Sequence, residues 1–117
     1  MNTGFTIAAL LRRNRFRLGH ETLLQADVEA LFRREAIPYE REFVLGPADR
    51  VDFLVDGRIA LELKIRAPKR AIFRQIERYA AHDVVGSVVI AAVSPLGVPP
   101  LANGKPVYVV PLGRSGL

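Results

Sequence analysis

The chain contains no cysteine, and its 117 residues include only two histidines, His20 and His82. The lack of cysteine excludes disulfides, thiolate-bound zinc, iron–sulfur clusters and a cysteine nucleophile. The two histidines stand far apart in the sequence, which leaves little basis for a histidine-rich metal site. Any metal ion would therefore be held by oxygen ligands.

Long apolar runs are also lacking, since no stretch approaches the ~20 residues that cross a bilayer. The apolar segment 5–11 precedes its arginines, whereas a signal peptide places its positive charge first. We therefore expect a cytoplasmic protein.

Size and composition predict one globular domain. The chain has a mass of 13.0 kDa, with 50% hydrophobic and 25% charged residues, which is enough for a single core. We expect a basic helix or arm at 1–18 and a single domain at 19–117.

The positive charge is concentrated near the N-terminus. Of the net charge of +5, four units come from residues 1–20, which hold no acid. These cations are Arg12, Arg13, Arg15 and Arg17. Such a segment favours a polyanionic partner, either nucleic acid or a membrane surface, although a solubilising face has the same composition.

Hydrophobic periodicity predicts an α/β fold. Apolar residues recur at helical spacing within 19–38, and a shorter helix is expected at 6–15. The expected later elements are strands at 39–45, 50–55 and 58–66, a helix at 68–82, a strand at 84–93, a loop at 94–105 and a strand at 106–111. Hairpins followed by a helical crossover predict a mixed central sheet flanked by helices.

Alternation predicts the register of the second hairpin. Its apolar residues are all odd-numbered: Val51, Phe53, Val55, Ile59, Leu61, Leu63 and Ile65. If they share one core, odd residues pair with odd ones, across a three-residue loop that includes Asp56 and a left-handed Gly57. We then expect Asp52, Glu62 and Lys64 on one face.

The three charged residues expected on one face of the hairpin have two possible explanations. Lys64 either pairs with Asp52 or Glu62 on a solvated face, or the carboxylates form an oxygen site for Mg²⁺ while the lysine orients water or phosphate.

Asp52, separated by nine residues from Glu62-Leu63-Lys64, resembles the motif of the PD-(D/E)XK phosphodiesterases, the restriction-endonuclease-like nucleases. Gln75 and Tyr79 are similar to the QxxxY motif of the RecB-like branch. The resemblance covers about residues 19–94 and departs from the pattern at Val51, where the motif has proline.

The resemblance implies a restriction-endonuclease-like αβββαβ core and a Mg²⁺- or Mn²⁺-dependent nuclease that acts on DNA without strong sequence specificity, of phage or mobile-element type. Asp52, Glu62, the Leu63 carbonyl and Glu21 would hold the metal, and Lys64 would position the attacking water. The expected substrate contacts are Gln75, Tyr79, Arg74, Arg70, Lys69, Arg12, Arg13, Arg15 and Arg17.

Several alternatives stay open at this level. Glu21 can simply complement a helix dipole, and Gln75 and Tyr79 can be ordinary neighbours on an amphipathic helix. Glu29 competes with Glu21, but its spacing places it on the polar side with Gln25 and Arg33. The rival functions are a non-catalytic nucleic-acid-binding or assembly module, a dimeric Holliday junction resolvase, a subunit of a larger complex and a membrane-surface protein.

Overall fold

The computed structural model describes residues 1–94 and 96–113. The elements are α1 (Gly4–Arg12), α2 (Glu21–Arg34), β1 (Tyr39–Gly46), β2 (Asp49–Val55), β3 (Ile59–Lys64), α3 (Lys69–Ala80), β4 (Ser87–Ala92), β5 (Leu101–Ala102) and β6 (Lys105–Pro111). The sequence predicted this order except for β5, which falls in the expected loop. Pro95 of that loop and residues 114–117 of the expected domain lie outside the described residues.

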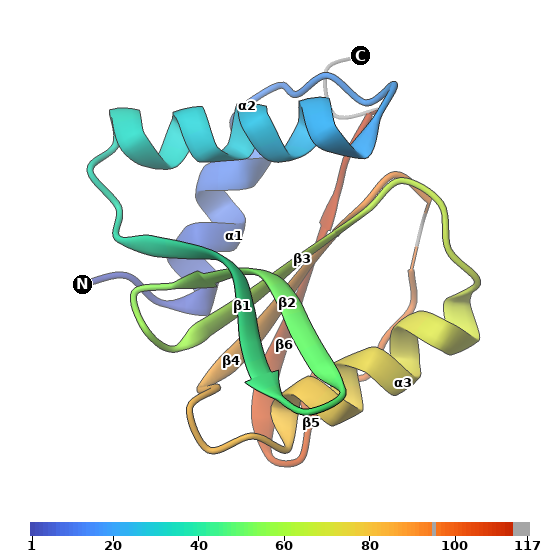
Figure 1. Ribbon diagram of the computed structural model, residues 1–117. Helices are drawn as coiled ribbons and strands as arrows, with labels where there is room; N and C mark the ends of the chain where they lie inside the picture. The colour runs from blue at the N-terminus through green and yellow to red at the C-terminus, as the bar shows by residue number, and fades with distance from the viewer. Residues whose placement is uncertain (95, 114–117) are drawn as a thin grey trace.

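The strands form one mixed sheet in the order β1-β2-β3-β4-β6-β5. β1, β2 and β3 are antiparallel neighbours, while β3, β4 and β6 run parallel. Helices α1 and α2 cover one face of this sheet and α3 covers the other (Figure 1). The predicted mixed α/β fold is confirmed at this level. No helix in the described ranges combines the length and the hydropathy needed to span a membrane.

Helix α1 is packed into the core under α2. It begins at a capping box between Thr3 and Thr6, and it buries Ile7 and Leu11 in the same cluster as Leu24 of α2. The segment 1–18, expected as a basic helix or arm ahead of the domain, therefore contributes to the core of that domain.

The β2–β3 register is confirmed. Phe53 pairs with Leu61 and Val55 pairs with Ile59 across a three-residue loop. Within that loop Asp56 has φ 55° and Gly57 has φ 72°, the positive values that tight hairpin turns require.

The expectation that every odd apolar residue faces one core is wrong at Val51. Phe53 packs under α1 and α2, but Val51 packs with Leu54 on the α3 face. In the neighbouring strand, Glu42 has φ 51° and lies opposite this point. Since a left-handed residue interrupts the alternation of a strand, the far half of the β1–β2 hairpin turns toward α3.

The tip of that hairpin is fastened to the C-terminal end of α3. The Asp49 carboxylate accepts a hydrogen bond from Arg78 Nε at 2.8 Å, and its other oxygen lies 2.9 Å from His82 Nε2. Gly46 leaves room for the His82 ring, because a Cβ there would lie 2.8 Å from it. Beyond Phe53, where β2 no longer pairs with β3, the far end of β2 is thus attached to α3.

Candidate active site

The candidate site lies in the space between β2 and β3 beyond their last paired residues. This space, lined by Asp52 of β2 and by Glu62 and Leu63 of β3, is called the seam below. The β2–β3 ladder ends at the Phe53–Leu61 pair. Beyond it, Asp52 Oδ2 accepts a hydrogen bond from the Leu63 backbone N–H at 2.8 Å, and the Asp52 N–H donates to Glu62 Oε1 at 3.1 Å. Two carboxylates thus take the places that backbone carbonyls occupy in a continuous ladder.

Both acids are costly to ionise in this seam. Burial, and next the Glu62 charge, raise the pKa of Asp52 to about 7. Burial also raises the pKa of Glu62, whose residue is only 5% exposed, although Lys64 opposes that shift. An acid pair with raised pKa values is typical of catalytic and metal-binding sites.

Lys64 and Tyr79 lie on the Glu62 side of the pair. Lys64 Nζ lies 3.0 Å from Glu62 Oε2. The Tyr79 hydroxyl donates to the Arg50 carbonyl oxygen at 3.0 Å, and it also helps to lower the pKa of Glu62. Burial and the nearby acids raise the pKa of Tyr79, so its hydroxyl stays protonated. Tyr79 of α3 therefore lies close to Glu62, with its own proton donated to the Arg50 carbonyl oxygen.

The Leu63 carbonyl oxygen points into the same seam. In a strand, the N–H and C=O of one residue point to the same side, and the Leu63 N–H points to Asp52. The next carbonyl, of Lys64, points to β4, where it accepts from the Val93 N–H at 3.0 Å. Three of the four predicted metal ligands therefore converge, namely Asp52, Glu62 and Leu63.

Glu21, the fourth predicted ligand, is exposed in the first turn of α2. Its charge is among the groups that raise the pKa of Asp52. Nevertheless, in the described part of the chain no three or more His, Asp or Glu side chains are grouped as a metal-ion site. Glu21 therefore lies on the Asp52 side of the seam without joining the pair.

The three charges converge for a different reason from the one expected. Lys64 pairs with the Glu62 carboxylate, which lies near Tyr79 of α3, whereas Asp52 sits between the strands and lies 3.4 Å from Gln25 of α2. A single shared sheet face is therefore not what joins them. The three side chains meet in the seam, because β2 and β3 separate at the point where the alternation of side chains along β2 reverses.

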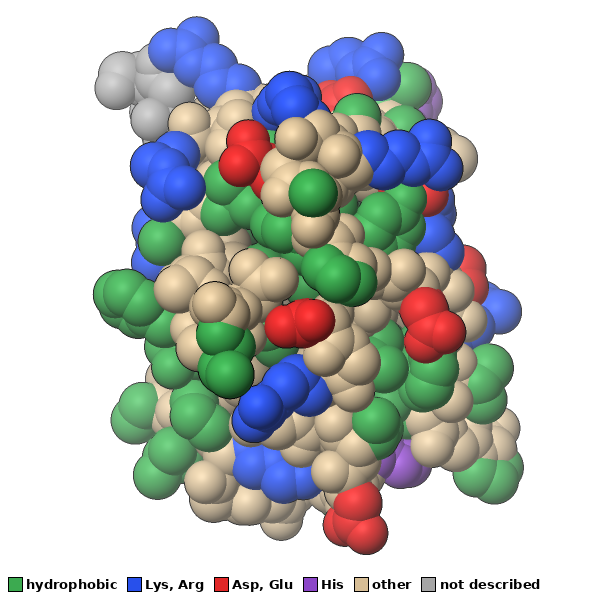
Figure 2. All heavy atoms as spheres, turned by 90° about the vertical axis from the view of Figure 1, so that its left-hand side faces the viewer, with side chains coloured by type: hydrophobic (Ala, Val, Ile, Leu, Met, Phe, Trp, Pro, Cys, Tyr) green, Lys and Arg blue, Asp and Glu red, His purple; other side chains and the backbone are tan. Residues whose placement is uncertain are grey.

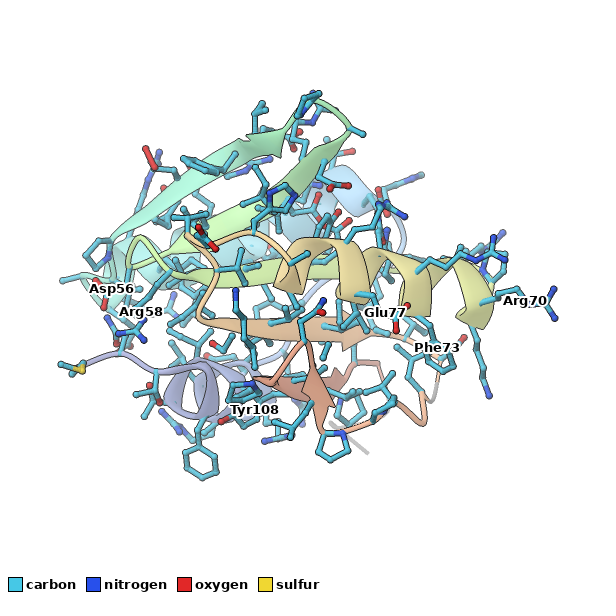
Figure 3. All side chains as sticks on the ribbon, turned by 90° about the horizontal axis from the view of Figure 1, so that it is seen from below. Asp56, Arg58, Arg70, Phe73, Glu77 and Tyr108 are labelled. Atoms are coloured by element: carbon cyan, nitrogen blue, oxygen red, sulfur yellow. The ribbon has the colours of Figure 1, made fainter. Side chains whose placement is uncertain are left out.

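A hollow of about 310 Å³ adjoins Lys64 and is lined by α3. Gln75 and Arg74, both predicted to contact substrate, line it together with Arg78. Residues 64–78 carry six basic side chains and one acid. Lys69 and Arg70 are exposed at the start of α3, and Arg70 extends from the end of the helix away from the sheet (Figure 3). This end of the molecule is therefore strongly basic.

The predicted N-terminal arginines are all exposed, at the end of α1 or in the loop after it. Arg12 donates to the Val109 carbonyl oxygen at 2.7 Å, and Arg17 forms an ion pair with Asp27 at 2.7 Å. Arg13 is the C-cap of α1, and Arg15 follows it in the loop. Arg17 is thus already partnered by an acid.

Sequence reasoning missed Gln25 and Arg41. Gln25 was expected on the outer, polar side of its helix, yet it contacts Asp52. The sequence contained a signal for this contact, because Gln25 lies one helical turn after Glu21, on the same side of the helix. Arg41 Nη2 donates to Gln25 Oε1 at 2.9 Å. Arg41 also carried a signal, because it is a charged residue on the half-buried side of β1, in line with Tyr39 and Phe43.

No protein-family model, curated protein or solved structure matches this chain.

Proposed function

We propose that the protein is a metal-dependent nuclease, which hydrolyses phosphodiester bonds of DNA without strong sequence specificity on a restriction-endonuclease-like core of the RecB-like branch. The observation that carries this proposal is the reciprocal pairing of Asp52 and Glu62 in an open seam, with Lys64 3.0 Å from Glu62. The order helix, three strands, helix, strand from α2 to β4 supports it.

The donor set fits a hard divalent cation. Two carboxylates and the Leu63 carbonyl offer oxygen ligands, which Mg²⁺ and Mn²⁺ prefer. Both carboxylates have raised pKa values, so a bound cation would relieve a repulsion that the fold maintains. Asp52, Glu62 and the Leu63 carbonyl would hold the ion, and Glu21 would reach it through water. A bound ion supplies polarisation of the phosphate and stabilisation of charge on the leaving oxygen.

The chain's own groups would carry the remaining steps. Lys64 would orient the attacking water through its ammonium group, because Glu62 holds that group in place and the side chain is only 16% exposed. Tyr79 of α3 would provide a polar neighbour for the Glu62 carboxylate. Gln75 and Arg74 line the adjoining hollow and would hold the substrate strand. Lys69 and Arg70 would make sequence-independent phosphate contacts.

Cleavage of labelled single-stranded, duplex and junction DNA, and of RNA, in Mg²⁺, Mn²⁺ or EDTA tests this proposal. We expect metal-dependent cleavage that falls at least about 100-fold in Asp52→Asn and Lys64→Met. The matched control is Asp56→Asn, the same chemical change in the turn at the far end of the molecule from Arg70 (Figure 3), which should retain activity.

The other outcomes separate the rival functions. Cleavage confined to junctions, by a dimer, would identify a resolvase. DNA binding without cleavage in either metal would identify a non-catalytic module. Activity that persists in EDTA would contradict the mechanism.

A further inference from the structure

Gln25 contacts the Asp52 carboxylate from the side of α2. Its Nε2 lies 3.4 Å from Asp52 Oδ1, and its Oε1 accepts a hydrogen bond from Arg41 Nη2 at 2.9 Å. The second Asp52 oxygen is occupied by the Leu63 N–H at 2.8 Å. Asp52 is therefore flanked by N–H groups from two directions.

The orientation of the Gln25 amide is determined by Arg41. A guanidinium only donates hydrogen bonds, so the amide must present its oxygen to Arg41 and its NH₂ group to Asp52. Arg41 is itself held in place: Nη1 donates to Glu29 Oε1 at 2.9 Å, and the guanidinium lies 5.1 Å from the centroid of the fully buried Phe53 ring. The amide is thus prevented from turning its oxygen toward Asp52.

We propose that Gln25, fixed by Arg41, is a positioning residue that closes the α2 side of Asp52 to cations and limits the site to one divalent ion. This inference rests on the proposed metal-dependent function. An NH₂ group offers protons and no lone pair to a cation. On the other side of Asp52, Glu62 and the Leu63 carbonyl provide the oxygen ligands for the single ion.

Calorimetric titration with Mn²⁺ on the full chain tests the stoichiometry. We expect one ion per chain for the wild type and two for Gln25→Glu, in which one carboxylate oxygen accepts from Arg41 and the other replaces the NH₂ group. Ala26→Glu is the matched control, because it adds the same charge at an exposed position of the same helix. It should bind one ion.

A second variant keeps the inference testable if Gln25→Glu fails to fold. Gln25→Met keeps the length of the side chain and removes the donor to Asp52. It should still bind one ion, with an affinity weakened about tenfold, as is usual when a group that orients a ligand is lost. Circular dichroism checks that each variant is folded.

The outcomes separate this inference from the proposed function. If the wild type binds no Mn²⁺, the proposed function fails. Two ions on the wild type, one ion on a folded Gln25→Glu, or an unchanged affinity in Gln25→Met would overturn the role of Gln25 alone.

Discussion

The pKa of Asp52 is about 7 in the folded chain, because burial and then the nearby Glu62 carboxylate penalise its charged form. In the unfolded chain the same acid titrates near 3.9, the usual value for aspartate. Between roughly pH 4 and 7 the folded state therefore holds a proton that the unfolded state has released. Protonated Asp52 therefore contributes to the stability of the folded state below about pH 4, and this contribution is lost as the pH rises through the pKa of Asp52 in the folded chain.

Asp52→Asn should remove this pH-dependent loss, since asparagine retains an oxygen that can accept from the Leu63 N–H. Without metal, we expect the variant and the wild type to have similar free energies of unfolding near pH 4. The variant should then gain up to about 2–4 kcal/mol relative to the wild type by pH 7 and above. Urea unfolding in EDTA at several pH values measures the difference. A difference that does not change with pH would contradict the raised pKa.

At the scale of single residues, the sequence predicted which charged residues form the candidate site more fully than it predicted how they are arranged. Asp52, Glu62 and Lys64 were selected because charged side chains in an apolar hairpin need partners, and the structure brings them together. Gln25 was placed on the wrong side of its helix, because a polar residue beside an apolar stripe predicts solvent as readily as a polar site. Its contact depends on Arg41, which comes from another element.

At the scale of elements, the sequence predicted the hairpin pairing but not its twist. Odd-numbered apolar residues required odd-to-odd pairs, and Phe53 pairs with Leu61 accordingly. The reversal at Val51 coincides with a left-handed Glu42 and with the attachment of Asp49 to α3. Neither is visible in a pattern of period two, because both arise from contacts with distant residues.

The β2–β3 turn offers a test of this local geometry. Gly57 has φ 72°, and a Cβ there would meet nothing within 4 Å. Gly57→Ala should therefore cost about 1–2 kcal/mol of unfolding free energy through backbone strain alone. Gly19→Ala is the matched control: a Cβ there also meets nothing within 4 Å, and its φ is not positive. Denaturant titration should show little change or a slight gain in stability for Gly19→Ala. Equal effects of the two variants would refute the turn assignment.

At the scale of the whole molecule, the candidate site is assembled by elements from across the chain. Asp52 and Glu62 come from β2 and β3, while Gln25 and Tyr79 come from the helices on opposite faces of the sheet. The sequence predicted this order of elements, and it placed basic residues at both 12–17 and 69–74. It did not predict that Asp27 would pair with Arg17, which offsets one of the four N-terminal cations.

The distribution of charge differs between the two ends of the molecule. The side that contains the C-terminal end of α2 and the β2–β3 turn mixes acidic, basic and hydrophobic side chains (Figure 2). Residues 64–78, which lead from the seam into α3, carry six cations and one acid. If DNA binds over the seam, phosphate contacts should come from this second end. If only the net charge of the molecule mattered, every surface cation would contribute equally to DNA binding.

Two double variants of equal net charge distinguish these cases. Arg70→Gln with Arg74→Gln should weaken DNA binding for all sequences alike and flatten the slope of log affinity against log salt by about 0.7 to 0.9 for each lost contact. Arg34→Gln with Arg58→Gln removes the same charge from exposed positions at the end of α2 and in the β2–β3 loop, and should leave the slope nearly unchanged. Fluorescence anisotropy over a range of salt concentrations measures both slopes, and cleavage at saturating DNA should change less than affinity in either variant. Equal flattening by the two pairs would show that DNA responds to the charge of the whole molecule, and the basic start of α3 would then not be the phosphate-binding surface.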